Sequence, residues 1–195
     1  MRRIAPIATL CALAVLAAGC ASPPSHFYTL SRTATPTAAT SNLAVVVGPV
    51  SIPAIVDLPQ IVVSTGPNQV TLDEFNRWAS PLQNNISRVV AENLVAMLGT
   101  PRVSLFQQSL NADADYRVAI EVQTFESRPG EAATLNAVWI VRRTKDGKAE
   151  TGRTAVREAV PDKDYAALAA AHSRALERLS QDVADTVKAL DRGPR

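Results

Sequence analysis

An apolar run near the N-terminus limits which part of this chain can take part in a fold. Met1-Arg2-Arg3 is followed by Ile4 to Ala18, a segment made mostly of Ala, Leu, Ile and Val. A membrane-spanning helix needs about 20 such residues. A positive start, a shorter apolar stretch and then small residues are typical of a secretory signal peptide. We therefore expect residues 1–19 to be removed on export, and the rest to form one domain behind a tether.

The end of this run, Leu16-Ala17-Ala18-Gly19-Cys20, resembles a bacterial lipobox. Small residues before the cysteine suit a peptidase that accepts an extended chain, and the cysteine thiolate is the nucleophile that accepts a diacylglyceryl group. The sequence therefore predicts cleavage between Gly19 and Cys20 and lipidation of Cys20. The alternative is an ordinary signal peptide with a chance cysteine.

Lipidation would hold the mature protein at a membrane, because two or more acyl chains anchor stably where one does not. The residue after Cys20 is Ala21. Under the enterobacterial sorting rule that the lipobox resemblance implies, a residue other than Asp at this position favours the outer membrane. We expect the protein to be anchored by fatty acids such as palmitate at the periplasmic side of the outer membrane.

The 176 residues that remain after cleavage carry no net side-chain charge. Removal of residues 1–19 takes away Arg2 and Arg3 but no acidic residue, which leaves 18 basic and 18 acidic side chains. This balance argues against a nucleic-acid partner. Cys11 is lost with the signal and Cys20 is acylated, so no disulfide is available. The stability of the domain must come from an apolar core.

Hydrophobic periodicity divides the mature chain into a tether and a domain. Residues 20–42 are rich in Ser, Thr, Pro and Ala, which is typical of a flexible tether, although the aromatic stretch within residues 26–30 could dock as a strand. Residues 43–192 form the domain. Its last strand is rich in charge and is expected at a sheet edge. The expected strands cover residues 43–52, 60–64, 69–72, 102–106, 116–126, 133–144 and 148–160.

Two amphipathic helices are expected to cover the sheet. Apolar residues recur at helical spacing over residues 82–98 and 168–190. Ser80 suits the N-cap of the first helix, with Pro81 in its first turn, and Gly99 suits its end. The predicted fold class is α+β. A mixed, mostly antiparallel sheet is covered by two helices, at about residues 80–98 and 164–190, in a single domain.

The sequence lacks the common catalytic and metal-binding motifs. It contains no HExxH, GxSxG or GxxxxGK[ST], and His172 lies on the apolar stripe of the last helix, where a satisfied core histidine is the simpler interpretation. Two pairs of nearby carboxylates, Asp73-Glu74 and Asp113/Asp115, leave a hydrolase open as an alternative. We expect no catalytic residue, no metal site and no cofactor, and therefore no enzyme.

Two further stretches are unusual, and both have structural interpretations. Asp57 could cap a turn and Pro59 would fix the start of a strand. Further along, Trp78 would pack as a hydrophobic staple where a helix begins. The candidate structural or partner-binding residues from these two stretches are Asp57, Pro59, Gln60, Arg77, Trp78 and Pro81.

These stretches together resemble the ABC-type transport auxiliary lipoproteins of the PqiC/YmbA type. That family carries Asp-Arg-Pro-Gln-(Ile/Leu)-Val in a proline-flanked region, Arg-Trp-Ala-Glu-Pro-Leu at a helix start, and Tyr-Tyr-Leu after the lipid anchor. The corresponding residues here are 57–62, 77–82 and 27–30. Leu58 stands where Arg is common, which removes a charge that a partner could pair with. Ser80 stands where Glu is common, which fits its expected capping role.

The resemblance implies a function in intermembrane lipid transport. The protein would be a non-enzymatic auxiliary or docking component of an MCE-type ABC system, with an MCE-domain protein as partner and a homo-oligomeric assembly. The residues themselves leave two other classes open. One is a structural lipoprotein that supports another outer-membrane or peptidoglycan-linked machine, and the other is an envelope hydrolase. A direct lipid carrier would need an apolar cavity of roughly several hundred Å³, whereas the helices are sized to cover a sheet.

Overall fold

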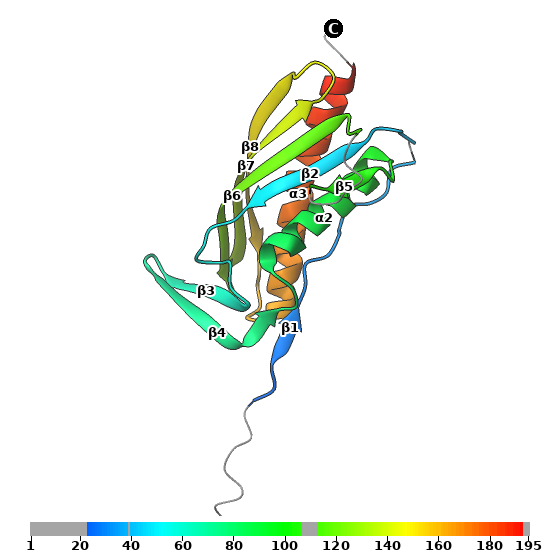
Figure 1. Cartoon of the computed structure of the whole chain (residues 1–195). Helices are drawn as coiled ribbons and strands as arrows, with labels where there is room; N and C mark the ends of the chain where they lie inside the picture. Colours follow the sequence, from blue (N-terminus) through cyan, green and yellow to red (C-terminus); the bar gives the residue numbers. More distant parts are fainter. Residues whose placement is uncertain (1–22, 39, 107–112, 193–195) are drawn as a thin grey trace, which may run out of the picture.

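The chain folds into strands and helices close to the expected ranges. The computed structural model describes residues 23–38, 40–106 and 113–192. Within these residues it forms eight strands and two helices (Figure 1). In chain order these are β1 (His26–Tyr28), β2 (Val45–Ser51), β3 (Gln60–Gly66), β4 (Gln69–Trp78), α2 (Leu82–Leu98), β5 (Val103–Leu105), β6 (Tyr116–Arg128), β7 (Ala132–Arg143), β8 (Ala149–Ala159) and α3 (Tyr165–Arg192).

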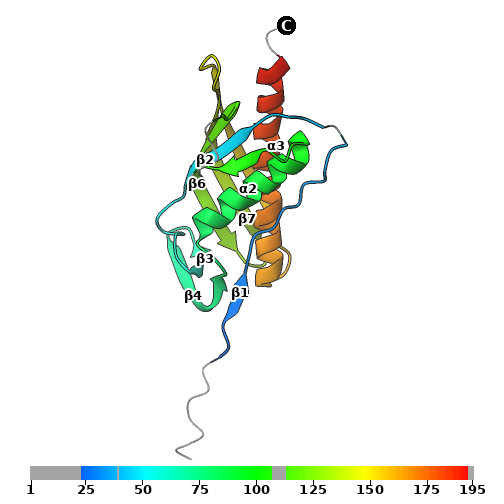
Figure 2. The same ribbon diagram turned by 45° about the vertical axis from the view of Figure 1, so that its right-hand side comes forward.

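A five-stranded sheet in the order β5-β2-β6-β7-β8 forms one layer of the domain. β2 runs parallel to both of its neighbours, whereas β6, β7 and β8 form an antiparallel meander. The helices α2 and α3 pack side by side against one face of this sheet (Figures 1 and 2). The expected α+β fold class is confirmed, and the charged strand β8 lies at the sheet edge as predicted.

A second sheet, in the order β1-β4-β3, was not expected from the sequence. We call it the small sheet. β3 and β4 form an antiparallel hairpin, and β1 pairs with β4 in parallel. β2 is irregular at Gly48-Pro49, where its register against β6 shifts, but it pairs with β6 again at Val50 and Ser51. The chain leaves the large sheet after Ser51 and turns at residues 54–56. β3 then pairs with β4 and not with the large sheet.

The core lies between the five-stranded sheet and the two helices. Buried residues alternate along β6 and β7, and α3 buries the predicted stripe, including Leu168, Leu176 and Leu190. Each large apolar side chain removed from water contributes about 1.5–3 kcal/mol. Several polar contacts also join the sheet to α3. In one of them the indole N–H of Trp139 donates to Thr154 Oγ1 (3.0 Å), and that hydroxyl donates to Asp182 on α3 (2.6 Å).

The segment between β1 and β2 packs on the helices, which differs from the flexible tether predicted for residues 20–42. It runs along α2 (Figures 1 and 2), and its Leu30 is fully buried in the core. The amide of Thr37 donates to the carbonyl of Ala96 (2.9 Å), and the amide of Ser41 donates to that of Gly99 (2.9 Å). From His26 onward the described residues thus belong to the domain.

The start of α2 differs from the predicted cap. The N-cap residue is Pro81, with no side-chain capping bond, and not Ser80. The reason is that the amide of Ala79 is still bound to the carbonyl of Tyr28 in β1 (2.8 Å), so the chain remains part of the small sheet up to that point. The predicted end is confirmed, since Gly99 adopts a left-handed conformation (φ 62°) and its amide donates to Val95 (3.1 Å).

Candidate functional site

The two unusual sequence stretches meet in the small sheet. Gln60 and Arg77 are register partners across β3 and β4, and the amide of Trp78 donates to the carbonyl of Pro59 (2.8 Å). The side chains of Gln60 and Arg77 both bind the Glu74 carboxylate, at 3.1 and 3.3 Å. Glu74 joins the two motifs, a role that the sequence analysis did not assign to it.

The other two motif residues lie at the margins of this group. Asp57 is exposed in the loop before β3, and its amide donates to the carbonyl of Ala54 (3.3 Å). Pro81 lies at the start of α2, where its carbonyl accepts the amide of Asn85 (3.0 Å). Asp57 thus ends a turn through its backbone amide, and Pro81 takes the N-cap position that was predicted for Ser80.

Trp78 anchors the motif to the core through an aromatic column. Its ring is 5 % exposed and meets Phe125 of β6 edge-on, with centroids 6.2 Å apart. Phe125 in turn stacks on the imidazole of His172 in α3, with centroids 3.8 Å apart and planes 9° from parallel. The column links the small sheet, the large sheet and α3, so the position of β4 depends on core packing.

His172 is the polar end of this column. It is fully buried, its Nε2 lies 2.9 Å from Ser127 Oγ, and its Nδ1 has no hydrogen-bond partner among the described residues. Burial lowers the pKa of His172 to about 3, because the low-dielectric core disfavours the imidazolium. The imidazole is neutral at physiological pH and out of reach of solvent. This is the core position that the sequence favoured, although only one of the two ring nitrogens has a hydrogen-bond partner among the described residues.

Asp73 closes a bulge in β4 and is not free for acid–base chemistry. Its Oδ1 accepts the amides of Phe75 (3.0 Å) and Asn76 (2.9 Å), and its Oδ2 accepts the amide side chain of Asn76 (3.0 Å) and the hydroxyl of Tyr165 (2.6 Å). Partial burial disfavours the carboxylate, but the hydrogen bonds outweigh it and lower the pKa of Asp73. A general acid needs the opposite shift.

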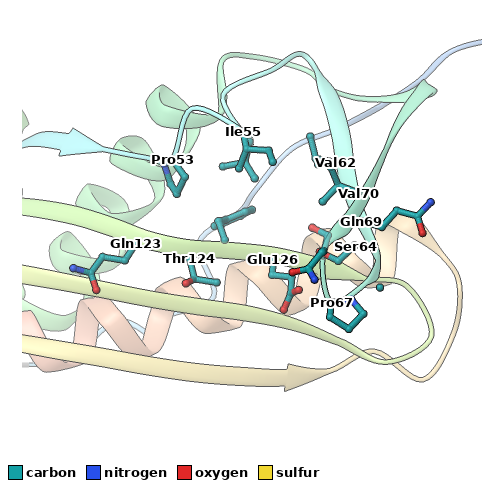
Figure 3. Close-up of a pocket in the computed structure, with 15 residues that line it drawn as sticks. Pro53, Ile55, Val62, Ser64, Pro67, Gln69, Val70, Gln123, Thr124 and Glu126 are labelled. Carbon is teal, nitrogen blue, oxygen red and sulfur yellow. The ribbon is translucent and has the colours of Figure 1, made fainter.

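A cleft of about 540 Å³ lies between the small sheet and β6. Figure 3 shows its two walls, with the β3–β4 hairpin and the loop that carries Pro53 and Ile55 on one side and β6 on the other. Apolar side chains, among them Val62 and Phe125, contribute much of the lining. Glu126 is also present, with its pKa lowered by Arg128, whose guanidinium lies 2.9 Å away. The volume falls in the range of small-molecule sites, roughly 300–1,000 Å³.

The family is decided by a comparison that covers most of the chain. A family model described as the ABC-type transport auxiliary lipoprotein component matches residues 28–184. The chain belongs to this family. The resemblance carried by the sequence motifs is confirmed, and the match begins within β1 of this auxiliary lipoprotein, in agreement with the packing of the segment that follows.

Solved structures share the fold of the auxiliary lipoprotein at low identity. A crystal structure of an uncharacterized protein is 19% identical with a TM-score of 0.69, and the match covers 85% of this chain and 99% of that chain. Protein XCC0632 from Xanthomonas campestris, of the family DUF330, is 23% identical with a TM-score of 0.64, covering 82% and 93%. These likenesses show the fold alone. The comparison with curated proteins gives no match.

Other site predictions for the auxiliary lipoprotein have different outcomes. The predicted cleavage and lipidation residues, Gly19 and Cys20, lie outside the described residues. Among the described helices none is long and apolar enough to cross a membrane. The described residues also contain no cluster of three or more His, Cys, Asp or Glu side chains that is arranged to hold a metal ion. Asp115, one of the nearby carboxylates, accepts the amide of Ala44 (2.8 Å) in a turn.

Replacing Asp73 tests its structural role. Asp73→Ala removes four hydrogen bonds to a charged acceptor, and we expect it to lower the free energy of unfolding by about 2 kcal/mol. The matched control is Glu74→Ala, whose side chain is 61% exposed and whose ion pair with Arg77 is worth about 0.5 kcal/mol. Urea denaturation measures both. Equal effects of the two substitutions would contradict the assigned role of Asp73.

Burial of neutral His172 predicts an acid-sensitive stability. The pKa of about 3 in the folded state lies below the value of about 6.5 for an unfolded histidine, so the unfolded chain takes up a proton first as the pH falls. Between pH 7 and 4.5 the free energy of unfolding of the wild type should fall by about 2–3 kcal/mol because of this group alone. His172→Gln keeps a polar partner for Ser127, and its free energy of unfolding should fall by that much less over the same pH range. Parallel losses in urea denaturation at the two pH values would contradict this account.

Proposed function

We propose that this auxiliary lipoprotein is anchored to the outer membrane through Cys20 and faces the periplasm. There it acts as a non-enzymatic docking component of an MCE-type ABC system for intermembrane lipid transport. Its partner is an MCE-domain protein that reaches across the periplasm from the inner membrane, and the lipoprotein works as a homo-oligomer.

The family match over residues 28–184 is the observation that carries this proposal. A lipobox ending at Cys20 lies just before the matched region, as an auxiliary lipoprotein requires. A non-enzymatic role is supported by the environment of Asp73 and His172, the two side chains considered above for acid–base chemistry. Asp73 is engaged in the β4 bulge, and His172 is buried and neutral. The MCE partner and the homo-oligomer rest on the sequence resemblance.

The packing of the N-terminal segment supports a docking role for the anchored domain. A docking component must hold its partner at a defined position relative to the membrane. Because residues from His26 onward are bound to the domain, few residues separate the anchor from the folded part. The distance that the domain can move away from the membrane is therefore short, whereas a long flexible tether would allow a much larger distance.

Affinity purification from native membranes tests the proposal. The wild-type protein with a C-terminal tag is compared with two variants, and co-purified proteins are identified by mass spectrometry. Cys20→Ser removes the acylated residue, whereas Ala21→Asp keeps the lipid but, under the sorting rule, retains the protein in the inner membrane. We expect an MCE-domain protein with the wild type and at least a tenfold loss with Cys20→Ser.

The Ala21→Asp variant separates lipidation from location. Loss of the MCE partner in both variants would show that docking requires the outer membrane, as proposed. Wild-type protein that brings down only barrel or peptidoglycan-associated proteins would contradict the transport role and favour a structural lipoprotein. Detergent phase partitioning of the wild type and Cys20→Ser reports lipidation separately.

A further inference from the structure

Exposed apolar side chains gather around the small sheet. The described residues contain seven large hydrophobic side chains that are exposed, and five of them belong to β1, β4 or the loop before β3. Scattered surface apolar residues are ordinary, but a cluster marks an interaction site. The five residues, which we call the small-sheet patch, are Phe27, Ile55, Val70, Leu72 and Phe75.

Strand register places most of this patch on one face. Leu72 pairs with Val62, and Arg77 pairs with Gln60. Val62 and Gln60 are two residues apart on β3, so their partners Leu72 and Arg77 point to the same side.

The other strand residues of the patch follow by the same alternation. Val70 lies two residues from Leu72, and Phe75 lies two residues from Arg77, so each shares the face of its neighbour. Phe27 of β1 pairs directly with Arg77 and also shares this face. Ile55 and Val70 both line the cleft.

The first part of the hairpin that carries the patch is free of charge, whereas Asp73, Glu74 and Arg77 follow in the second half of β4, where Glu74 and Arg77 form an ion pair. No Asp, Glu, Lys or Arg occurs from Leu58 to Leu72, a run of 15 residues in a chain with 38 such residues. An exposed strand pair of a domain surrounded by water usually carries charges. A surface that avoids charge over this length is suited to an apolar environment, into which charged groups are costly to transfer.

The predicted lipidation site is close in sequence to this surface. Cys20 precedes His26, the first residue of β1, by six residues, which span at most about 20 Å when fully extended. β1 is itself a strand of the small sheet. Acyl chains on Cys20 would therefore hold the membrane within reach of the small-sheet patch, at a high effective concentration.

We propose that the small-sheet patch lies on the surface of the membrane that holds Cys20, with its side chains among the lipid acyl chains. This inference rests on the lipidation of Cys20 in the proposed function. Five side chains are few compared with the roughly 20–30 residues that each partner contributes to a stable protein interface. Shallow insertion beside an existing anchor needs no such area, because the anchor already holds the domain at the membrane.

The proposed contact also orients the domain. β1 lies at the start of α3, where the rings of Tyr28 and Tyr165 are 5.9 Å apart. The turn between β7 and β8 lies at the other end, since Arg143 donates to the carbonyl of Leu190. With 28 residues, α3 separates these two ends by about 40 Å. The β7–β8 turn would then point away from the membrane into the periplasm (Figure 1).

Site-directed fluorescence quenching tests this contact. The lipidated chain has no cysteine other than Cys20 after cleavage, so single cysteines can be labelled with an environment-sensitive dye. Leu72→Cys reports on the patch, and Thr71→Cys reports on the opposite face of the same strand. Lys145→Cys reports on the β7–β8 turn. The proteins are reconstituted in vesicles of phosphatidylethanolamine and phosphatidylglycerol that contain a nitroxide on an acyl chain.

The quenching pattern decides between occupants of the patch. We expect the Leu72 label to be quenched at least twofold more than the Thr71 label, and the Lys145 label to be unaffected. Equal quenching at positions 71 and 72, or none at position 72, would overturn the proposal. A Leu72 label that is shielded in unlipidated Cys20→Ser protein without vesicles, increasingly with protein concentration, would assign the patch to a second copy and also overturn it.

Failure of the membrane contact can be distinguished from failure of the proposed function. Detergent phase partitioning shows whether Cys20 is lipidated, and the affinity purification shows whether the MCE partner binds. A lipidated protein that binds its partner but shows no quenching at position 72 contradicts the membrane contact alone. A protein without lipid contradicts the anchored function itself.

Discussion

A buried asparagine on α2 joins the N-terminal segment to both helices, and the position of the domain relative to its predicted anchor depends on this contact. Asn93 is fully buried, and its Oδ1 accepts the amides of Thr33 (3.3 Å) and Ala34 (3.2 Å). Its Nδ2 donates to Ser180 of α3 (3.3 Å). One side chain thus binds the N-terminal segment to both helices. Removing it would leave two backbone amides without their acceptor, and a buried unsatisfied donor costs about 1–3 kcal/mol.

This docking gives the anchor a fixed relation to the domain. Leu30 fills the core next to the bonded segment, and β1 pairs with β4, which carries the second family motif. Trp78, the second residue of that motif and the last of β4, belongs to the aromatic column with Phe125 and His172. The small sheet is therefore held both by the segment that follows the anchor and by the core. A surface fixed in this way can present the same face to a membrane or a partner at all times.

Much of the fold could be predicted from the sequence, because its apolar residues follow helix and strand periods closely. The stripes of α2 and α3, the edge position of β8 and the end of α2 at Gly99 all follow from local patterns. The second sheet could not be predicted, since the pairing of β1 with β4 joins segments that are about 50 residues apart in the sequence. The docked segment was missed because its Ser, Thr, Pro and Ala composition resembles a linker. Its backbone amides bind side chains and carbonyls on α2 that only the tertiary structure brings near.

The candidate site shows the same division between local and non-local information. The motif residues were identified from the sequence, but Glu74 as their common partner depends on the β3–β4 register. The cleft against β6 likewise depends on the packing of the two sheets. The absence of charge from Leu58 to Leu72 was visible in the sequence, and together with the nearby anchor it was the signal that could have located the small-sheet patch.

We infer that the segment from His26 onward is part of the domain and not a flexible tether. Native-state hydrogen exchange of its backbone amides tests this claim. The amides of Ala34 and Thr37, bound to Asn93 and Ala96, should be protected and should open together with α2. Exchange of these amides at the rate of an unstructured peptide, while α2 remains protected, would contradict the claim.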